Sequence, residues 1–293
     1  MKSGRVSLVG LPNAGKSTLL NRLVGQKLAI VSDKPQTTRT RLIGVRNYPD
    51  GQVVYVDTPG IHKPLHRMNV RMVDEAKEAL RDVDVVAVVL DATQRPGRGQ
   101  QMLIDLVRPL RQPVVLALNK IDLVSKPALL PIIDRLAREQ VFAEIVPVSA
   151  LSGDGVDRLE QVFLKYLPEG PALFPEDFLT DRPERFFAAE IVREQVLQHT
   201  HAELPFTTAV LVDRWEEAEN GLVRLYCTIL VERESQKPIL IGRRGEMIKT
   251  IGTAARLELE RFLDRRVYLD LRVKVRGEWR EDERVLDELL PRA

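Results

Sequence analysis

The chain has 293 residues, 44% of them hydrophobic and 29% charged, with a formal net charge of +2. These values predict an ordinary soluble globular protein of about two domains. No window approaches the ~18–20 apolar residues of a membrane span, and the N-terminal MKSGRVSLVG leads straight into a strand. Neither a transmembrane segment nor a secretory signal is therefore expected. The lone cysteine, Cys227, excludes an internal disulfide.

Residues 1–167 alternate short apolar runs with helical stretches. This alternation predicts an α/β domain with a mostly parallel sheet and helices on both faces. Pro49-Asp50-Gly51 is a turn signal and predicts one hairpin, between the second and third strands. The expected strands are RVSLVG, TRLIGVRNY, QVVYVD, DVVAVVLDA, PVVLALNK and EIVPVSA, and the expected helices lie near 16–25, 68–81, 99–110, 127–139 and 156–166.

The pattern breaks in the proline-rich stretch LPEGPALFPEDFLTDRP, and residues 168–182 are expected to link two domains. Leu173, Phe174 and Phe178 would order part of this linker by packing. A smaller α+β domain is expected over residues 183–293. Its predicted elements are a helix at 184–200, strands at 207–215 and 221–231, a short helix, a GRRG turn, a helix at 246–263, a strand at 267–276 and a terminal helix.

The sequence GLPNAGKS, residues 10–17, follows the first expected strand and opens the first expected helix. It fits the pattern GxxxxGK(S/T), in which glycines let backbone N–H groups approach phosphate oxygens and the helix N-terminus adds its dipole. Lys16 would reach the β- and γ-phosphates, and the Ser17 hydroxyl would ligate Mg²⁺. The residues expected at the phosphates are Gly10, Leu11, Pro12, Asn13, Ala14, Gly15, Lys16, Ser17 and Thr18.

The sequence NKID, residues 119–122, ends the strand PVVLAL and favours GTP over ATP. The Asp122 carboxylate can accept hydrogen bonds from guanine N1–H and N2–H₂, which adenine lacks, and such a mismatch can discriminate by about 10⁴–10⁵. Asn119 would tie this loop to the phosphate loop, and the Lys120 stem would lie along the purine face. The expected base-side residues are Asn119, Lys120, Ile121, Asp122 and, after the strand EIVPV, Ser149 and Ala150, whose backbone would donate to guanine O6.

The sequence DTPG, residues 57–60, follows the strand QVVYV. Asp57 would hold Mg²⁺ through water, and the Gly60 N–H would sense the γ-phosphate. Thr37 or Thr38 would complete the metal shell, and Thr38 is preferred. The nucleotide contacts expected here are Asp57, Thr58, Pro59, Gly60 and Ile61, and the expected metal ligands are Ser17, Thr38 and Asp57.

Ile61 stands where many GTPases place a water-orienting glutamine. Isoleucine cannot orient water by hydrogen bonding, so unaided hydrolysis is expected at about 10⁻⁴–10⁻³ s⁻¹. Asn13 offers an uncharged oxygen beside the phosphates and is a candidate ligand for K⁺, which would supply charge in the transition state. The first domain is thus predicted to be a P-loop GTPase that takes GTP, GDP and Mg²⁺. The residues expected to act in catalysis are Lys16, Asn13, Thr38 and Gly60.

The stretch ILIGRRGEMIKTIG, residues 239–252, brackets two arginines with glycines. Residues 233–276 hold 12 Lys and Arg against 6 Asp and Glu, although a basic region is often only a solvated face. Two interpretations stay open on these residues alone, a plain glycine turn and a clamp for an RNA backbone. The residues that an RNA clamp would use are Ile241, Gly242, Arg243, Arg244, Gly245 and Lys249.

Taken together, these motifs resemble the Era family of bacterial ribosome-assembly GTPases. The resemblance is carried by GLPNAGKSTLLN, PQTTR, DTPG, NKID and SA, and further along by FPEDFLTDRPERF, ELPF, LVERESQKPILIGRRGEMIKTIG and WREDERVL. It covers essentially the whole chain. It implies that the second domain is a bacterial-type KH domain whose GxxG loop grips single-stranded RNA near the 3′ end of small-subunit ribosomal RNA. It also implies K⁺ binding by the P-loop asparagine, in agreement with Asn13.

The resemblance further implies a cytoplasmic protein that acts in small-subunit assembly, with peripheral association at the inner face of the cell membrane. The sequence shows no amphipathic anchor that would support that association. A monomer is expected. A signalling GTPase with a protein-binding second domain is the main alternative, and the basic excess around the GxxG counts against it. A tRNA-modifying GTPase is a second alternative, but it usually carries a C-terminal cysteine motif, whereas this chain ends in ELLPRA. A passive RNA-binding protein is a third, which only turnover would exclude.

Overall fold

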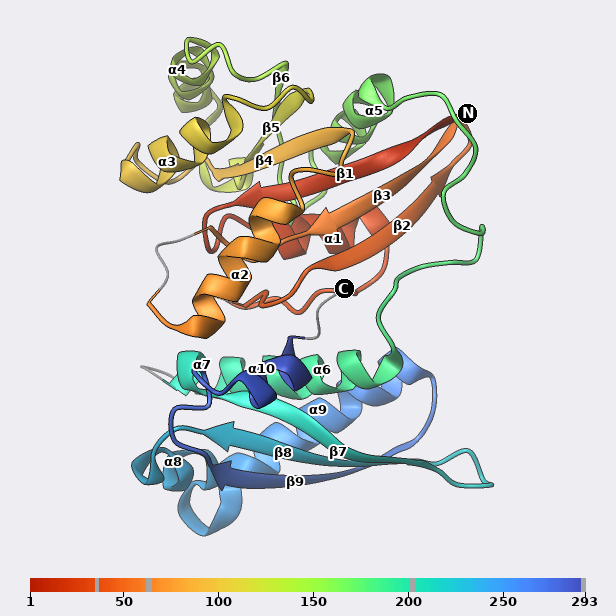
Figure 1. The fold of residues 1–293 in the computed structure, drawn as a ribbon, viewed down its shortest axis with the longest axis vertical. Helices are drawn as coiled ribbons and strands as arrows, with labels where there is room; N and C mark the ends of the chain where they lie inside the picture. Colours follow the sequence, from red (N-terminus) through yellow and green to blue (C-terminus); the bar gives the residue numbers. More distant parts are fainter. Residues whose placement is uncertain (35–36, 62–64, 201–203, 291–293) are drawn as a thin grey trace. The chain divides into compact units, whose positions relative to one another are not determined.

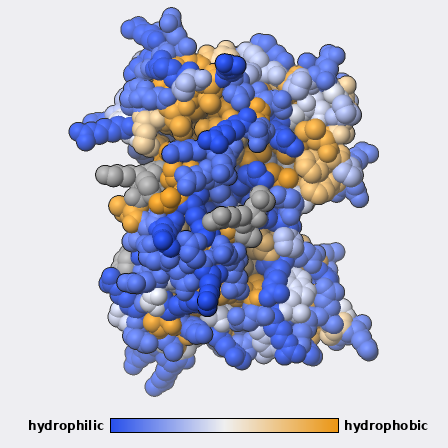
Figure 2. Space-filling model, in the orientation of Figure 1, coloured by the Kyte–Doolittle hydropathy of each residue, from blue (hydrophilic) through white to orange (hydrophobic). Residues whose placement is uncertain are grey.

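The structure is a computed structural model that describes residues 1–34, 37–61, 65–200 and 204–290. It contains two compact units, one from Met1–Leu65 and Asn69–Asp181 and the other from His66–Met68 and Arg182–Ala293 (Figure 1). Hydrophilic residues make up most of the surface of each unit that is visible in Figure 2. No helix in the described ranges has both the length and the hydropathy needed to cross a bilayer.

In the described part of the chain, the first unit is built on a six-stranded sheet with the order β2-β3-β1-β4-β5-β6 (Figure 1). β2 runs antiparallel to β3, whereas β1 pairs parallel with β3 and β4, and β5 pairs parallel with β4 and β6. This confirms the predicted mostly parallel sheet and its hairpin. The strands are β1 (Lys2–Gly10), β2 (Leu42–Tyr48), β3 (Gly51–Asp57), β4 (Val85–Asp91), β5 (Val114–Asn119) and β6 (Glu144–Pro147).

Helices cover both faces of this sheet, because central strands such as VVAVVLD in β4 are apolar on both sides. α1 (Lys16–Val24) and α5 (Val156–Tyr166) pack on one face. α2 (Arg67–Glu78), α3 (Arg98–Val107) and α4 (Lys126–Ala137) lie on the other, where α3 and α4 share a buried core with β4 and β5. The parallel strands β1, β3, β4 and β5 end at one edge of the sheet, so Gly10, Asp57, Asp91 and Asn119 come together there.

The segment that follows α5 is tied to the first unit, and residues 171–180 lie along its edge. The buried Gln52 side chain accepts hydrogen bonds from the N–H groups of Leu173 (2.7 Å) and Phe174 (2.9 Å) and donates to the Phe174 carbonyl (2.8 Å). The rings of Phe174 and Phe178 stack at 4.4 Å and pack on a buried cluster of β2 and β3. The expected packing of both phenylalanines is confirmed, whereas Leu173 is 44% exposed.

The second unit holds a three-stranded sheet, counted over the described residues, with the order β7-β8-β9. β7 and β8 are antiparallel, and β8 and β9 are parallel. Alternate apolar residues of β8, from Val223 to Val231, pack in one core with α6 and α9. The elements are α6 (Glu184–His199), α7 (Leu204–Thr207), β7 (Ala209–Glu217), β8 (Val223–Val231), α8 (Lys237–Ile241), α9 (Glu246–Leu263), β9 (Val267–Val275) and α10 (Glu283–Leu289).

Two predicted strand starts in the second unit were wrong. The strand expected from Thr207 begins at Ala209, because Leu204–Thr207 forms the short helix α7, whose last hydroxyl bonds the Leu204 carbonyl. The strand expected from Gly221 begins at Val223, because Gly221 has φ +77 and lies in the hairpin turn. The first strand of the chain is longer than expected. It begins at Lys2, which pairs with Gly51.

Candidate functional site

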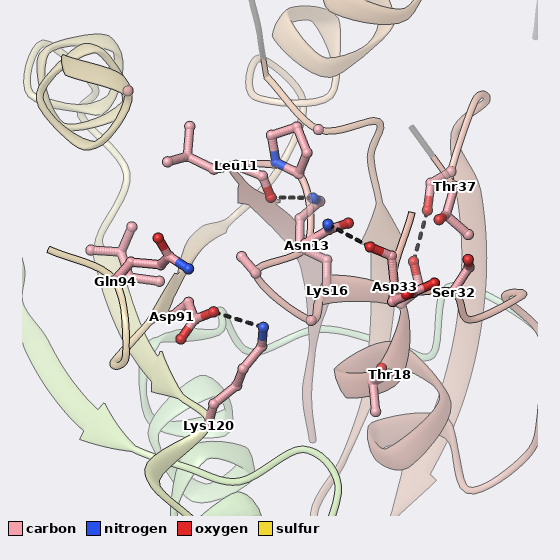
Figure 3. Close-up of a pocket in the computed structure, with 18 of the residues that line it drawn as sticks. Leu11, Asn13, Lys16, Thr18, Ser32, Asp33, Thr37, Asp91, Gln94 and Lys120 are labelled. Carbon is pink, nitrogen blue, oxygen red and sulfur yellow. Dashed lines mark hydrogen bonds and ion pairs between the residues drawn. The ribbon is translucent and has the colours of Figure 1, made fainter. Parts of the chain in front are cut away.

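The phosphate-binding sequence forms a loop between the end of β1 at Gly10 and the start of α1 at Lys16. Gly15 has φ +92, and a Cβ built on it would lie 2.3 Å from Asn119 Nδ2, so the position requires glycine. Asn13 is also left-handed, with φ 63. Its side-chain amide donates to the Asp33 carbonyl at 2.8 Å (Figure 3).

Lys16 is buried at the base of this loop. Its Nζ donates to the carbonyls of Gly10 at 3.3 Å and Leu11 at 3.2 Å, both long hydrogen bonds. Burial lowers the pKa of Lys16, and the nearby Asp57 carboxylate opposes that shift. An ammonium desolvated in this way would gain from an anionic ligand, such as a phosphate.

The structure brings together the three side chains that were expected to ligate a metal. The Ser17 hydroxyl lies 2.7 Å from Thr38 Oγ1 and donates to Asp57 Oδ2 at 2.9 Å. Thr38 Oγ1 donates to the same carboxylate oxygen at 3.2 Å. Thr37 instead donates to the Lys34 carbonyl at 2.7 Å. Ser17, Thr38 and Asp57 therefore form one oxygen cluster.

This cluster fits a magnesium ion. Asp57 is fully buried, and its Oδ1 has no hydrogen-bond partner among the described residues. Burial raises the pKa of Asp57, while Lys16, Ser17, Thr38 and the Thr58 backbone act to lower it. A buried carboxylate with an orphaned oxygen calls for a cation or water. Mg²⁺ commonly uses only one or two carboxylates together with substrate phosphates, so the small donor set is sufficient.

On the base side, Asn119 joins two loops as expected. Its Nδ2 donates to the Ala14 carbonyl at 2.9 Å, and its Oδ1 accepts from the Ala150 N–H at 2.9 Å. Asp122 lies in the short turn Ile121–Leu123, with its side chain exposed and without a partner in the part of the chain that the structure describes. Ile121 is partly buried against the core. The free Asp122 carboxylate can accept hydrogen bonds from a ligand.

Ser149 and Ala150 were expected to donate backbone hydrogen bonds to guanine O6, which stays a prediction. Both residues are buried at the end of β6, but their N–H groups are already engaged. The Ser149 N–H donates to the Asp154 carbonyl at 2.8 Å, and the Ala150 N–H donates to Asn119. A guanine O6 would have to share the Ala150 N–H with Asn119.

The loop after β3 lies directly against the phosphate loop. A Cβ built on Gly60 would be 3.0 Å from the backbone nitrogen of Pro12, and the Ile61 N–H donates to the Gly10 carbonyl at 3.2 Å. The Ile61 side chain is 4% exposed and belongs to the core, which explains an apolar residue at this position. Thr58 donates to the Leu8 carbonyl at 2.8 Å, and Pro59 is buried next to it.

These loops surround a cavity of about 670 Å³ (Figure 3). It reaches from the phosphate loop to Lys120, but the side chains of Asp122, Ser149 and Ala150 do not line it. Leu11, Pro12 and Thr18 line the cavity as expected. The lining also includes residues that no motif pointed to, namely Ser32, Asp33, Asp91, Gln94, Arg95, Gly97, Gly99 and Gln100.

Among these missed residues, Asp91 could have been found from the sequence, because it lies at the end of the expected strand DVVAVVLDA and ligands bind at the carboxyl ends of parallel strands. The others lie in loops or at the start of α3, where no spacing rule marks them.

In the second unit, the GRRG turn connects α8 to α9. Gly242 (φ 74) and Gly245 (φ 81) are left-handed, and so is Arg244 with φ 52. A Cβ on Gly242 would lie 2.6 Å from Met247 Cβ, which explains the glycine. Ile241 is partly buried at the end of α8. Among the described residues, Arg243, Arg244 and Lys249 are exposed and form no ion pair.

One face of α9 packs into the core of the second unit. Ile251, Ala255 and Leu259 are fully buried. Ile248 is only partly buried, and Met247 packs against the core instead.

The first unit is a P-loop GTPase. Its mostly parallel sheet carries at one edge a phosphate loop, an oxygen cluster that fits Mg²⁺ and an NKID loop. An α+β unit with a GxxG turn follows it in the chain. Comparison with known proteins agrees. A family described as 50S ribosome-binding GTPase matches residues 5–120, and the KH domain family matches residues 204–280.

Relatives match over nearly the full chain. GTPase Era of Geobacter metallireducens is 52% identical and that of Ruminiclostridium cellulolyticum is 46% identical, each over 98% of this chain and 97% of the relative. The chain therefore belongs to the Era family of GTPases, as the sequence resemblance indicated.

Two solved structures are similar throughout. An Aquifex aeolicus Era variant bound to GDP and aluminium fluoride superposes with a TM-score of 0.94, and an Era complex with MgGDPNP and nucleotides 1506–1542 of 16S ribosomal RNA superposes with a TM-score of 0.95. Each is 43% identical and covers 99% of both chains.

Proposed function

We propose that this GTPase binds GTP with Mg²⁺ at the edge formed by β1, β3, β4 and β5. The observation that carries the nucleotide site is the convergence of Ser17 and Thr38 on Asp57, whose second oxygen is buried and unsatisfied. Mg²⁺ supplies charge neutralisation for the phosphates when it is bound. In this proposal Lys16 contacts the phosphates, Asp122 reads guanine, and Gly60 senses the γ-phosphate from its place against Pro12.

We propose that hydrolysis is slow without help and that K⁺ accelerates it through Asn13. The buried Ile61 cannot orient water, so transition-state charge must be stabilised by other groups. Asn13 supports the idea because its amide nitrogen is held by the Asp33 carbonyl, which leaves Oδ1 as an uncharged oxygen donor beside the phosphate loop.

The test is GTP turnover at saturating Mg²⁺ in K⁺ and in Na⁺, for the wild-type chain and for Asn13→Ala. Faster turnover in K⁺, lost in the variant, is expected. Equal rates in the two salts would remove Asn13 from the mechanism, and no turnover in either salt would contradict hydrolysis by this site.

We propose that the second unit binds single-stranded RNA from the 3′ end of small-subunit ribosomal RNA and that the protein acts in small-subunit assembly. Arg243, Arg244 and Lys249 are exposed cations without ion pairs among the described residues, next to two left-handed glycines that let phosphates approach the backbone. The related Era complex with 16S ribosomal RNA nucleotides supports the choice of RNA. A protein-binding second domain is not favoured, because the KH family matches residues 204–280.

We propose further that GTP orders the loops at about 33–41 and 57–70 and thereby exposes or assembles the RNA site. Residues 35–36 and 62–64 of these loops lie outside the described residues. RNA affinity that is identical with GDP and with a GTP analogue would contradict this coupling. We propose that the protein acts in the cytoplasm, where small subunits are assembled, and the expected monomer stays a prediction. The family resemblance also implied peripheral membrane association and K⁺ binding, and both stay predictions.

A further inference from the structure

At the base-side end of the cavity, Lys120 of the NKID sequence forms an ion pair with Asp91, a residue that no predicted motif includes. Lys120 Nζ is 2.7 Å from Asp91 Oδ2, and both residues line the cavity (Figure 3). The Asp91 side chain is 8% exposed and that of Lys120 is 31% exposed. The pairing follows from topology, because β4 and β5 are parallel and their register sets Asp91 opposite Asn119, directly before Lys120.

The Asp91 carboxylate is held rigidly for this contact. Its Oδ1 accepts hydrogen bonds from the Thr93 N–H at 2.9 Å and the Thr93 hydroxyl at 2.6 Å, which leaves Oδ2 for Lys120. Burial acts to raise the pKa of Asp91, but the hydrogen bonds from Lys120 and Thr93 outweigh it, and the pKa is lowered. The carboxylate is therefore charged at neutral pH. The Ala92 N–H also donates to the Asn119 carbonyl at 2.8 Å, which joins the two loops.

Lys120 needs such a partner. Its backbone is left-handed, with φ 64, and its side chain has four rotatable bonds, so ordering the side chain costs rotamer freedom. Because Asp91 holds the Lys120 ammonium before a nucleotide binds, the methylene stem of Lys120 is already ordered at the cavity wall. Without Asp91, the same ammonium would be free to turn towards the phosphates, which carry the opposite charge.

We propose that Asp91 is a positioning residue for the guanine site, which fixes the Lys120 ammonium so that the Lys120 stem lies ready against the purine face. This inference rests on the proposed GTP site, in which Lys120 packs on the base. Asp91 itself makes no contact with the nucleotide in this account. It acts through Lys120, so its contribution to nucleotide affinity must vanish when Lys120 is shortened.

The test is a double-mutant cycle on nucleotide affinity with Asp91→Asn, Lys120→Ala and the double variant, followed with fluorescent methylanthraniloyl-GDP and with IDP as a competitor. Asp91→Asn is expected to weaken GDP about tenfold, equivalent to about 1.4 kcal/mol. IDP should weaken by the same factor, because it lacks only the amino group that Asp122 reads and keeps the purine face. In the Lys120→Ala background, Asp91→Asn should change affinity less than about twofold.

The turnover number at saturating GTP separates positioning from general damage, and it should stay within about twofold in Asp91→Asn. Asp134→Asn is a surface control, because it removes an exposed ion pair with Arg138 of the same 2.7 Å length outside the cavity. An undiminished effect of Asp91→Asn in the Lys120→Ala background, or unchanged affinity in the single variant, would overturn the inference.

If Asp91→Asn does not fold, Thr93→Val carries the test, since it keeps the carboxylate and removes one of its donors. A loss of about threefold that disappears in the Lys120→Ala background is expected, and a loss that persists would overturn the inference. Wild-type protein that fails to bind methylanthraniloyl-GDP would instead contradict the proposed function itself, before any variant is compared.

Discussion

At the scale of single residues, the phosphate loop depends on contacts that span large distances in the sequence. Asn119 bonds both Ala14 and Ala150, so one side chain joins the phosphate loop to the loops after β5 and β6. Gly15 makes this possible because it has no Cβ in the space that the Asn119 amide occupies. Both the positive φ at position 15 and the packing against Asn119 therefore require glycine there.

Gly15→Ala is expected to abolish tight GDP binding, because the new Cβ would collide with Asn119 Nδ2 at 2.3 Å and the φ of +92 disfavours alanine. Gly221→Ala is the control. Its φ is +77, but a Cβ there would meet nothing within 4 Å, so it should lower the free energy of unfolding by only about 1 kcal/mol. Thermal unfolding and GDP titration of both variants check this. Wild-type GDP affinity in Gly15→Ala would contradict it.

The residues of the oxygen cluster were predicted from residue types and motifs alone. The motif DTPG and the serine of the phosphate loop predicted Asp57 and Ser17, and the preference for Thr38 over Thr37 agrees with the distances. The Asp91–Lys120 pair was not predicted, because it depends on which strands are neighbours. The engaged N–H groups of Ser149 and Ala150 were not predicted either, since backbone hydrogen bonds in a loop leave no residue signature.

At the scale of elements, periodicity placed the helices of the first unit within a few residues, because each has one apolar face on the sheet. The predicted helix near 156–166 and α5 coincide. The short helix α7 was missed, because four residues with a proline carry no helical period. The left-handed Arg244 in the GRRG turn was not predicted, because nothing in the sequence marks an arginine for positive φ.

The segment that Gln52 holds is expected to contribute strongly to the stability of the first unit. Gln52→Ala removes three hydrogen bonds between the buried Gln52 side chain and the partly buried backbone of Leu173 and Phe174, which should lower the free energy of unfolding by about 1–3 kcal/mol. Denaturant unfolding measures this. Gln101→Ala, on the surface of α3, removes one exposed hydrogen bond to Asp105 and should be nearly neutral. Equal effects of the two substitutions would contradict the role of Gln52.

The buried Cys227 thiol makes the stability of the second unit depend on pH. Burial raises its pKa to about 12, and the nearby Asp213 acts in the same direction. Because the Cys227 pKa is higher in the folded state than in the unfolded state, the free energy of unfolding is at its full value below the ordinary thiol range. It falls as pH rises from that range towards about 12. At pH 8 the native thiol should therefore resist alkylation by iodoacetamide and react only after denaturation. Rapid labelling of native protein at pH 8 would contradict the buried position.

At the scale of the whole molecule, the sequence predicted both folds because most signals agree at each level. Strand–turn–helix order, motif order and a proline-rich break all indicated a GTPase followed by a smaller α+β unit. What sequence could not supply is the link between the nucleotide and the RNA. That link depends on the energies of two states, and motifs at separate sites carry no information about such a difference.

The central claim is that the second unit binds RNA through the GRRG turn. The most direct measurement is the affinity of a fluorescent single-stranded oligonucleotide from the 3′ end of small-subunit ribosomal RNA, with a GTP analogue and at two salt concentrations. Wild-type chain would be compared with Arg243→Asp/Arg244→Asp. The charge control is Arg256→Asp/Arg261→Asp, which changes the charge of α9 by the same amount away from the turn and also removes ion pairs with Glu260 and Glu258, so its fold is checked by thermal unfolding. Tight binding that is lost only in the first variant is the predicted result. Equal losses in both variants, or no binding by the wild-type chain, would contradict an RNA clamp at this turn.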